Sequence, residues 1–127
     1  MRLTAELVAR KRSEIAALCR QDLDAATLLE RVRAPLRKVA PFDGAFFAAT
    51  DPATTLFASA AVIERLPAWT CAPYFDNEFL ADDFNKFVDL HGSSSGAVTL
   101  HRSTFDRPLR SSRRNEINTK VGFGTEL

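Results

Sequence analysis

The fold of this 127-residue chain is decided by the stretch Gly44-Ala-Phe-Phe-Ala-Ala-Thr-Asp-Pro-Ala-Thr-Thr-Leu-Phe-Ala-Ser59. Two apolar runs of strand length, residues 44–50 and 55–59, stand on either side of Asp51-Pro52-Ala53-Thr54. Asp followed by Pro is typical of the first two positions of a type I turn. The pattern predicts a β-hairpin. The hairpin needs further cover, because an isolated two-stranded hairpin is only marginally stable.

Two amphipathic helices are predicted before the hairpin. The first covers Thr4 to Arg20, and the second follows Asp22 or Asp24, either of which is a suitable N-cap. Pro35 lies inside the second helix and predicts a kink or an early end, because proline removes one backbone donor. Pro41 closes the segment. The apolar positions that share one side are Leu7, Val8, Ile15 and Leu18 in the first helix, and Leu28, Leu29, Val32, Leu36 and Val39 in the second.

The segment after the hairpin holds half of the chain's twelve aromatic residues. Phe75 and Phe79 are spaced i,i+4 and Phe84 and Phe87 are spaced i,i+3, so each pair is expected to share a helix face. We expect one or two short helices that lay an aromatic face on the sheet. The six aromatic residues are Trp69, Tyr74, Phe75, Phe79, Phe84 and Phe87.

The last third of the chain contains one more predicted strand and one more predicted helix. A flexible loop, Gly92–Gly96, leads into the strand Ala97–Leu100. Asp106 is the expected cap of a final helix that runs to about Val121, and Gly122 is a suitable residue to end it. Together these elements predict an α+β fold with N-terminal helices, a small antiparallel sheet and helical excursions.

Composition and charge indicate a soluble globular protein. Of the residues, 46% are hydrophobic and 26% are charged, and the net charge is +1. The pI near 7.8 gives no basis for nucleic-acid binding, and we read the basic stretch Arg110–Arg114 as a solvated helix face. The longest apolar run, residues 56–63, is too short to span a bilayer, and no secretion signal is found. We therefore predict no direct nucleic-acid partner, no membrane partner and a cytoplasmic location.

The sequence offers few residues for catalysis or metal binding. Cys19 and Cys71 form no C-x-x-C pair and are expected to be buried thiols in a reducing compartment. No zinc-ligand spacing or phosphate-binding glycine loop occurs, so no metal and no cofactor are predicted. A nucleophile–base pair of Cys71 with His91 or His101 remains an alternative.

A second catalytic alternative is the adjacent carboxylate pair Asp82 and Asp83. Neighbouring helical side chains point about 100° apart. We therefore expect one of the two to cap or pair and the other to be solvated. The prediction is that the chain has no catalytic residues.

The aromatic segment is the candidate ligand site. Ligand pockets are mostly apolar with a few polar groups, and this segment combines both kinds of side chain. The same residues also fit a hydrophobic core with a polar outer face. The predicted ligand-binding residues are Trp69, Tyr74, Phe75, Phe79, Asn85, Lys86 and Phe87.

Three stretches resemble a known family. They are Val39-Ala-Pro-Phe-Asp-Gly-Ala-Phe-Phe-Ala-Ala-Thr-Asp-Pro-Ala-Thr54, Cys71-Ala-Pro-Tyr-Phe-Asp-Asn-Glu-Phe-Leu-Ala-Asp-Asp-Phe-Asn-Lys-Phe87 and Ala97-Val-Thr-Leu100. The chain is similar to the GAF-like N-terminal sensor domains that precede LuxR-type helix-turn-helix transcriptional regulators. The resemblance implies a single GAF-like domain over residues 1–127, with leading helices in 1–40 and a partial sheet with helices in 41–127.

The resemblance also implies a function. Such domains are not catalytic, and they sense a small molecule or a partner and bias a DNA-binding module. Relatives continue beyond the segment matching residues 124–127 into further strands and that module, so an incomplete GAF-like fold is expected. The prediction is a non-enzymatic sensory or regulatory domain that binds a small apolar molecule, or a partner chain, including a second copy as a homodimer. The alternatives are a partner-completed interaction module, a non-functional truncated remnant, or a small hydrolase or isomerase.

Overall fold

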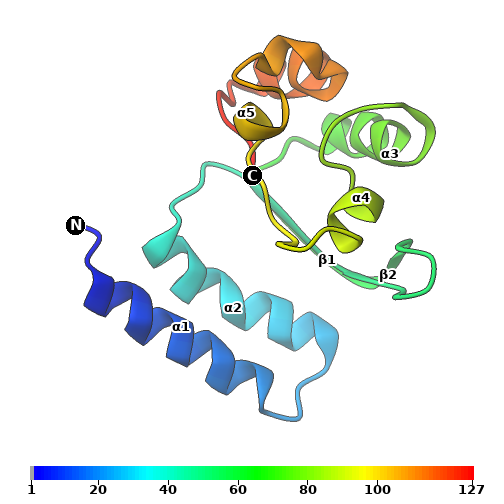
Figure 1. Ribbon diagram of the computed structural model, residues 1–127. Helices are drawn as coiled ribbons and strands as arrows, with labels where there is room; N and C mark the ends of the chain where they lie inside the picture. Colours follow the sequence, from blue (N-terminus) through cyan, green and yellow to red (C-terminus); the bar gives the residue numbers. More distant parts are fainter. Residues whose placement is uncertain (1) are drawn as a thin grey trace. The chain divides into compact units, whose positions relative to one another are not determined.

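The computed structural model describes residues 2–127, apart from the side chain of Ser59, and divides them into two compact units. Unit 1 holds the chain up to Pro52 together with Leu56–Arg65. Unit 2 holds Ala53–Thr55 and Leu66–Leu127. Helices and an antiparallel sheet are both present, which confirms the predicted α+β class (Figure 1). That all 127 residues form one GAF-like domain stays a prediction.

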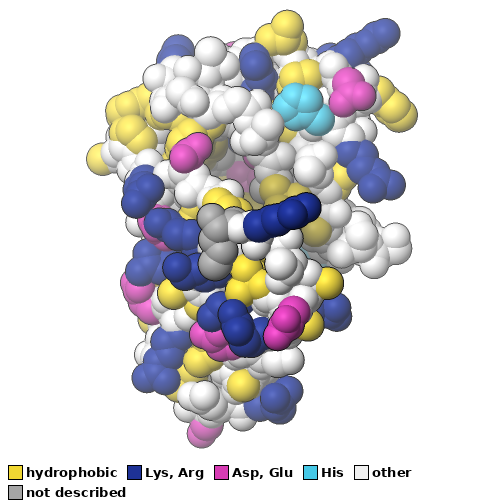
Figure 2. Space-filling model, turned by 90° about the vertical axis from the view of Figure 1, so that its left-hand side faces the viewer, with side chains coloured by type: hydrophobic (Ala, Val, Ile, Leu, Met, Phe, Trp, Pro, Cys, Tyr) yellow, Lys and Arg dark blue, Asp and Glu magenta, His cyan; other side chains and the backbone are white. Residues whose placement is uncertain are grey.

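Unit 1 begins with helices α1 (Ala5–Cys19) and α2 (Ala25–Val39), which lie side by side and run in opposite directions (Figure 1). Each helix has a side-chain N-cap, and that of α2 is Asp24, one of the two caps predicted from the sequence. The Thr4 hydroxyl accepts the Leu7 N–H at 3.1 Å. The Asp24 carboxylate accepts the Thr27 N–H at 2.9 Å. Exposed basic side chains gather on this helical pair (Figure 2).

Pro35 does not end α2 early, so that alternative was wrong. The proline is buried within the helix, which continues to Val39. Its fixed φ suits a helix, and what it removes is one backbone donor. The turn beyond it is held by the N–H of Ala40, which donates to the carbonyl of Leu36 at 2.8 Å.

The predicted hairpin is confirmed as strands β1 (Ala45–Thr50) and β2 (Phe57–Glu64), paired antiparallel from Ala45 opposite Glu64 to Thr50 opposite Phe57. Within residues 2–127 the sheet has these two strands. The predicted second strand, residues 55–59, was too short, because pairing with β1 continues to Glu64. The N–H of Asp51 donates to the carbonyl of Leu56 at 2.9 Å and closes the turn.

A carboxylate fixes α2 to the hairpin within unit 1. Glu64, at the end of β2, has a side chain only 16% exposed and forms ion pairs with Arg33 and Arg37 of α2. The Arg37 guanidinium also lies over the Phe42 ring, 4.6 Å from its centre. The rings of Phe46 and Phe57 are 5.1 Å apart across the two strands.

Unit 2 consists of short helices around a small core. Leu100 is 1% exposed and Ile117 is 3% exposed, and the polar residues Thr70, Thr104 and Ser111 are completely buried. Among residues 2–127, no helix is long and apolar enough to cross a membrane. The helical elements are η1 (Ala68–Thr70), α3 (Cys71–Leu80), α4 (Phe87–His91), α5 (Leu100–Ser103), η2 (Pro108–Arg110), η3 (Arg114–Asn118) and α6 (Thr119–Val121).

Two predictions for the middle of unit 2 were wrong. The expected strand Ala97–Leu100 is absent from the described residues, and Leu100 instead begins α5. The reason is a helix cap: the Thr99 hydroxyl accepts the Arg102 N–H at 3.2 Å. Phe84 and Phe87 do not share a helix face, because Phe84 lies in the loop before α4.

The start of the last helix also differs from the prediction. Asp106 has a left-handed φ of 60° and does not cap it. A separate turn, η2, follows, and the Ser111 hydroxyl then accepts the Arg114 N–H at 3.2 Å. Residues 114–118 form a π-helix before α6. Gly122, with φ of 87°, ends the helix as predicted.

Candidate functional site

Four of the predicted ligand-binding residues are exposed aromatic side chains. Trp69 lies in η1 and is 50% exposed, and Phe87 begins α4 and is 39% exposed. Phe75 and Phe79 share one face of α3, as the i,i+4 spacing predicted, and their ring centres are 6.5 Å apart. We call these four residues the exposed aromatic set.

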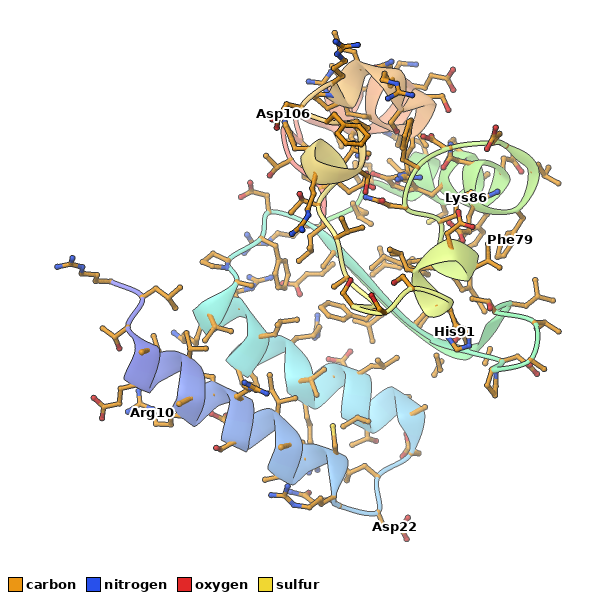
Figure 3. All side chains as sticks on the ribbon, in the orientation of Figure 1. Arg10, Asp22, Phe79, Lys86, His91 and Asp106 are labelled. Carbon is orange, nitrogen blue, oxygen red and sulfur yellow. The ribbon has the colours of Figure 1, made fainter. Side chains whose placement is uncertain are left out.

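Helices α3 and α4 are joined by a hydrogen bond beside the exposed aromatic set. The Phe87 N–H donates to the Glu78 carboxylate at 2.7 Å. Burial raises the pKa of Glu78, and the hydrogen bond from Phe87 offsets part of that rise. The ammonium of Lys86 donates to the carbonyl of Ala81 at 2.6 Å and closes the loop between the two helices. Figure 3 labels Phe79 and Lys86 on this part of unit 2.

Asn85, also predicted to bind ligand, faces α5. Its φ of 56° is left-handed, a conformation that asparagine adopts more readily than most residues. Its side-chain oxygen accepts the Ser103 hydroxyl at 2.5 Å. The amide nitrogen of Asn85 is buried and donates to none of the described residues.

Tyr74, the seventh predicted residue, belongs to a polar network. Its hydroxyl donates to the side-chain oxygen of Asn118 at 2.5 Å. Burial, with a smaller contribution from the negative charge of Glu126, raises the pKa of Tyr74 to about 12. The phenol is therefore a neutral donor at physiological pH.

Arg113 is the centre of this network and is only 8% exposed. Its Nη1 donates to the side-chain oxygen of Asn77 and its Nη2 to the carbonyl of Phe84, both at 2.8 Å. Its Nε lies 3.1 Å from each carboxylate oxygen of Glu126, and its Nη2 lies 2.5 Å from Oε1. For Arg113, the interpretation of the basic stretch as a solvated face was wrong, because the packing of unit 2 encloses this side chain.

Asp83 is the second charged residue of the network, and its side chain is 1% exposed. Its carboxylate accepts four hydrogen bonds of 2.7–3.0 Å, from the N–H groups of Phe84 and Arg113 and the side chains of Asn77 and Ser112. Burial alone would raise the pKa of Asp83, but these bonds outweigh it and lower the pKa to about 2. Asp82 is exposed. The expectation that one of the two would pair and the other be solvated is confirmed.

Only partial signals of this network are visible in the sequence. The final helix has few apolar residues, and buried polar residues take their place: Ser111, Arg113 and Asn118. Arg113 bonds to Asn77 and Asp83, and Asn118 bonds to Tyr74, and all three of these partners lie thirty or more residues away in sequence. No local pattern joins positions about thirty residues apart.

The residues considered for catalysis lie on separate elements. Cys71 begins α3, His91 ends α4 and His101 lies in α5. Both cysteines are free, and Cys19 is exposed at the end of α1, so the expectation that both thiols are buried was wrong for Cys19. Residues 2–127 contain no group of three or more His, Cys, Asp or Glu placed to hold a metal ion.

Comparisons with protein-family models, curated proteins and solved structures gave no match. The function is therefore inferred from the geometry of unit 2. It combines a buried polar network, which fixes the loops around α3, with four partly exposed aromatic side chains on η1, α3 and α4. Such side chains supply binding energy to an apolar partner by removing their exposed area from water.

Proposed function

We propose that this chain is a non-enzymatic, cytoplasmic sensory or regulatory domain of the GAF-like kind, related to the sensor domains of transcription regulators. It binds a small apolar molecule, or a partner chain, through the exposed aromatic set. The observation that carries the proposal is that these four aromatic side chains keep 39–50% of their surface in contact with solvent.

The exposed area is large enough to matter for affinity. A fully buried aromatic side chain removes 150–250 Å² from water, so the exposed part of each residue corresponds to roughly 60–125 Å². At about 25 cal/mol per Å², covering one of them contributes about 2 kcal/mol. Trp is also among the residues that most often dominate binding energy at protein interfaces.

The polar network supports this role by fixing the loops that hold the aromatic residues. Asp83 and Arg113 tie the loop before α4 to the final helix through the Arg113 N–H and through the carbonyl of Phe84. A ligand that contacts the exposed aromatic set shifts the population of unit 2 conformations only if it binds one conformation more tightly than another. Signal output would follow from that difference.

Equilibrium dialysis against neutral apolar probes, indole and 1-decanol, tests the proposal. The full chain is expected to take up at least one probe saturably, and Phe79→Ala is expected to weaken uptake by roughly tenfold or more, since about 2 kcal/mol of contact is lost. Phe105→Ala is the matched control, because Phe105 lies in the same unit, is 83% exposed and is outside the exposed aromatic set. Equal uptake by both variants contradicts the proposed surface.

A second candidate function is a partner-completed interaction module. The observation that favours it is the two-stranded sheet of unit 1, in which β1 and β2 each pair only with one another among the described residues. An exposed strand edge can accept a strand from another chain. Sedimentation velocity over a hundredfold range of protein concentration tests this candidate. Concentration-dependent association is expected, and a strictly monomeric species throughout the range counts against self-completion.

A further inference from the structure

The carboxylate of Glu126 lies in a site built entirely from donors. The Arg113 guanidinium approaches both of its oxygens at 2.5–3.1 Å, and the side-chain amide of Asn118 donates to Oε2 at 2.6 Å. The N–H of Leu100 donates to the backbone carbonyl of Glu126 at 2.9 Å. Arg113 and Asn118 are both more than nine-tenths buried. One side chain and one peptide group of the same residue are thus recognised together.

The donors hold their positions through contacts that do not involve Glu126. Arg113 is fixed by Asn77 and by the carbonyl of Phe84. The carboxylate of Asp83, 3.9 Å from Nη1, keeps part of the guanidinium charge compensated. Asn118 is fixed by the hydroxyl of Tyr74. A site that is preorganised in this way binds a ligand without the cost of ordering its own side chains.

The residue that fills the site comes from a segment with little structure of its own. Residues 123–127 contain no helix or strand and follow the left-handed Gly122. Gly124, Thr125 and Leu127 are exposed. Besides Glu126, the segment is attached by the Phe123 N–H, which donates to the carbonyl of Asn118 at 2.9 Å. Its attachment therefore depends mainly on the Glu126 carboxylate and the peptide bond beside it.

We propose that Arg113, Asn118 and the Leu100 N–H form a carboxylate-recognition site, which Glu126 occupies as an intramolecular ligand and which accepts a carboxylate-bearing ligand when residues 123–127 leave. The ligand is either a free carboxylic acid or an acidic side chain of an extended peptide. The planar fork of an arginine matches a carboxylate in two-point contact. A neutral amide of the same shape leaves the buried guanidinium with only the carboxylate of Asp83, 3.9 Å from Nη1, as its counter-charge and is rejected.

Chemical rescue of Glu126→Ala tests this site in the full chain. The variant removes the carboxylate and one methylene group, and because the Glu126 side chain is 21% exposed, the site is open enough for the one further carbon of propanoate. Propanoate at ten times its Kd is expected to raise the Tm of Glu126→Ala by roughly 5 °C, with saturation, whereas propanamide has no such effect. Glu116→Ala is the matched control, because Glu116 is an exposed glutamate on η3 of the same unit.

The outcomes separate the proposal from a general salt effect. An equal rise in Tm for Glu126→Ala and Glu116→Ala, or no rise for Glu126→Ala, overturns the site. If Glu126→Ala is unfolded, cooperative folding restored by propanoate supports the site, and failure of propanoate to restore it overturns it. Glu126→Gln is a second test variant, because its side chain keeps the shape of glutamate and still fills the space beside Arg113. Propanoate is therefore expected to raise the Tm of Glu126→Gln less than that of Glu126→Ala.

A peptide arm distinguishes the two ligand sources. Acetyl-Gly-Thr-Glu-Leu-amide, the sequence of residues 124–127, is added to Glu126→Ala beside propanoate. Tighter binding of the peptide indicates an acidic peptide ligand, and equal or tighter binding of propanoate indicates a free acid. The site uses none of the exposed aromatic set and its probes are charged, so its failure and that of the apolar-binding function are distinguishable.

Discussion

The buried carboxylate of Asp83 should be the most sensitive position in unit 2. Asp83→Asn removes the negative charge of a carboxylate that accepts four hydrogen bonds. It also replaces one carboxylate oxygen, an acceptor, with an amide NH₂ donor that faces the existing donors of Asn77 and Ser112. Hydrogen bonds to a charged group contribute roughly 1.5–3 kcal/mol against about 1 kcal/mol for neutral pairs. Breaking a buried ion pair costs about 3–5 kcal/mol. Because Arg113 keeps Glu126, we expect a loss of about 3 kcal/mol.

Urea unfolding followed by the fluorescence of Trp69, the single tryptophan of the chain, measures this loss in the unit that contains Asp83. With a slope of roughly 1.5 kcal/mol per molar urea, the midpoint should fall by about 2 M. Asp82→Asn makes the same chemical change at the exposed neighbour and should alter stability by no more than about 0.5 kcal/mol. A loss below about 1 kcal/mol for Asp83→Asn, or equal losses for both variants, would refute the network as a stabilising element.

Four further residues or conditions give measurable changes in unfolding or titration. The folded-state pKa of Asp83, about 2, lies below its ordinary 3.8. The ionised carboxylate therefore contributes about 2 kcal/mol to the free energy of unfolding above about pH 4, and this contribution is lost as the pH falls toward 2. Urea midpoints should show this loss in the wild type but not in Asp83→Asn. Tyr74, the single tyrosine, should ionise near pH 12 in phenolate absorbance, and a midpoint near pH 10 would contradict its burial. Leu100→Ala should lower stability by about 3 kcal/mol in urea unfolding, because the side chain is 1% exposed; a loss below about 1 kcal/mol would be inconsistent with that burial. Thr4→Ala should cost about 1 kcal/mol in thermal unfolding followed by circular dichroism, because α1 loses its cap, and an unchanged Tm would argue against the cap.

Unit 1 could be predicted from the sequence because its signals are local. Thr4 and Asp24 are followed at once by helical periodicity, and each caps its helix. Asp51-Pro52 marks a turn between two apolar runs, and the strands form on either side of it. The continuation of β2 to Glu64 was missed because its end depends on pairing with Ala45 and not on composition.

The last third of the chain could not be predicted in the same way. Thr99 turns an apparent strand into a helix start by capping it. Ser111 takes the capping role expected of Asp106, whose left-handed backbone places it outside the helix. The decisive bonds of Arg113 reach Asn77, thirty-six residues away. Sequence patterns that compare near neighbours contain no information about such bonds.

The candidate site was predicted in part. Aromatic density pointed to Phe75 and Phe79, whose shared face the i,i+4 spacing fixed correctly. Tyr74 belongs to the same aromatic cluster in sequence, but its hydroxyl engages Asn118 in the polar network. Which aromatic side chains remain exposed depends on tertiary packing, and composition alone does not determine it.

The proposed binding role is tested most directly by recording Trp69 fluorescence while the full chain is titrated with indole analogues that do not fluoresce in the same range, or with 1-decanol. Trp69 is itself part of the exposed aromatic set and reports binding where it is proposed to occur. The proposal predicts a saturable change in emission for the wild type and Phe105→Ala, with the Kd raised roughly tenfold or more in Phe79→Ala. A change that never saturates, or one with the same Kd in all three proteins, would contradict it.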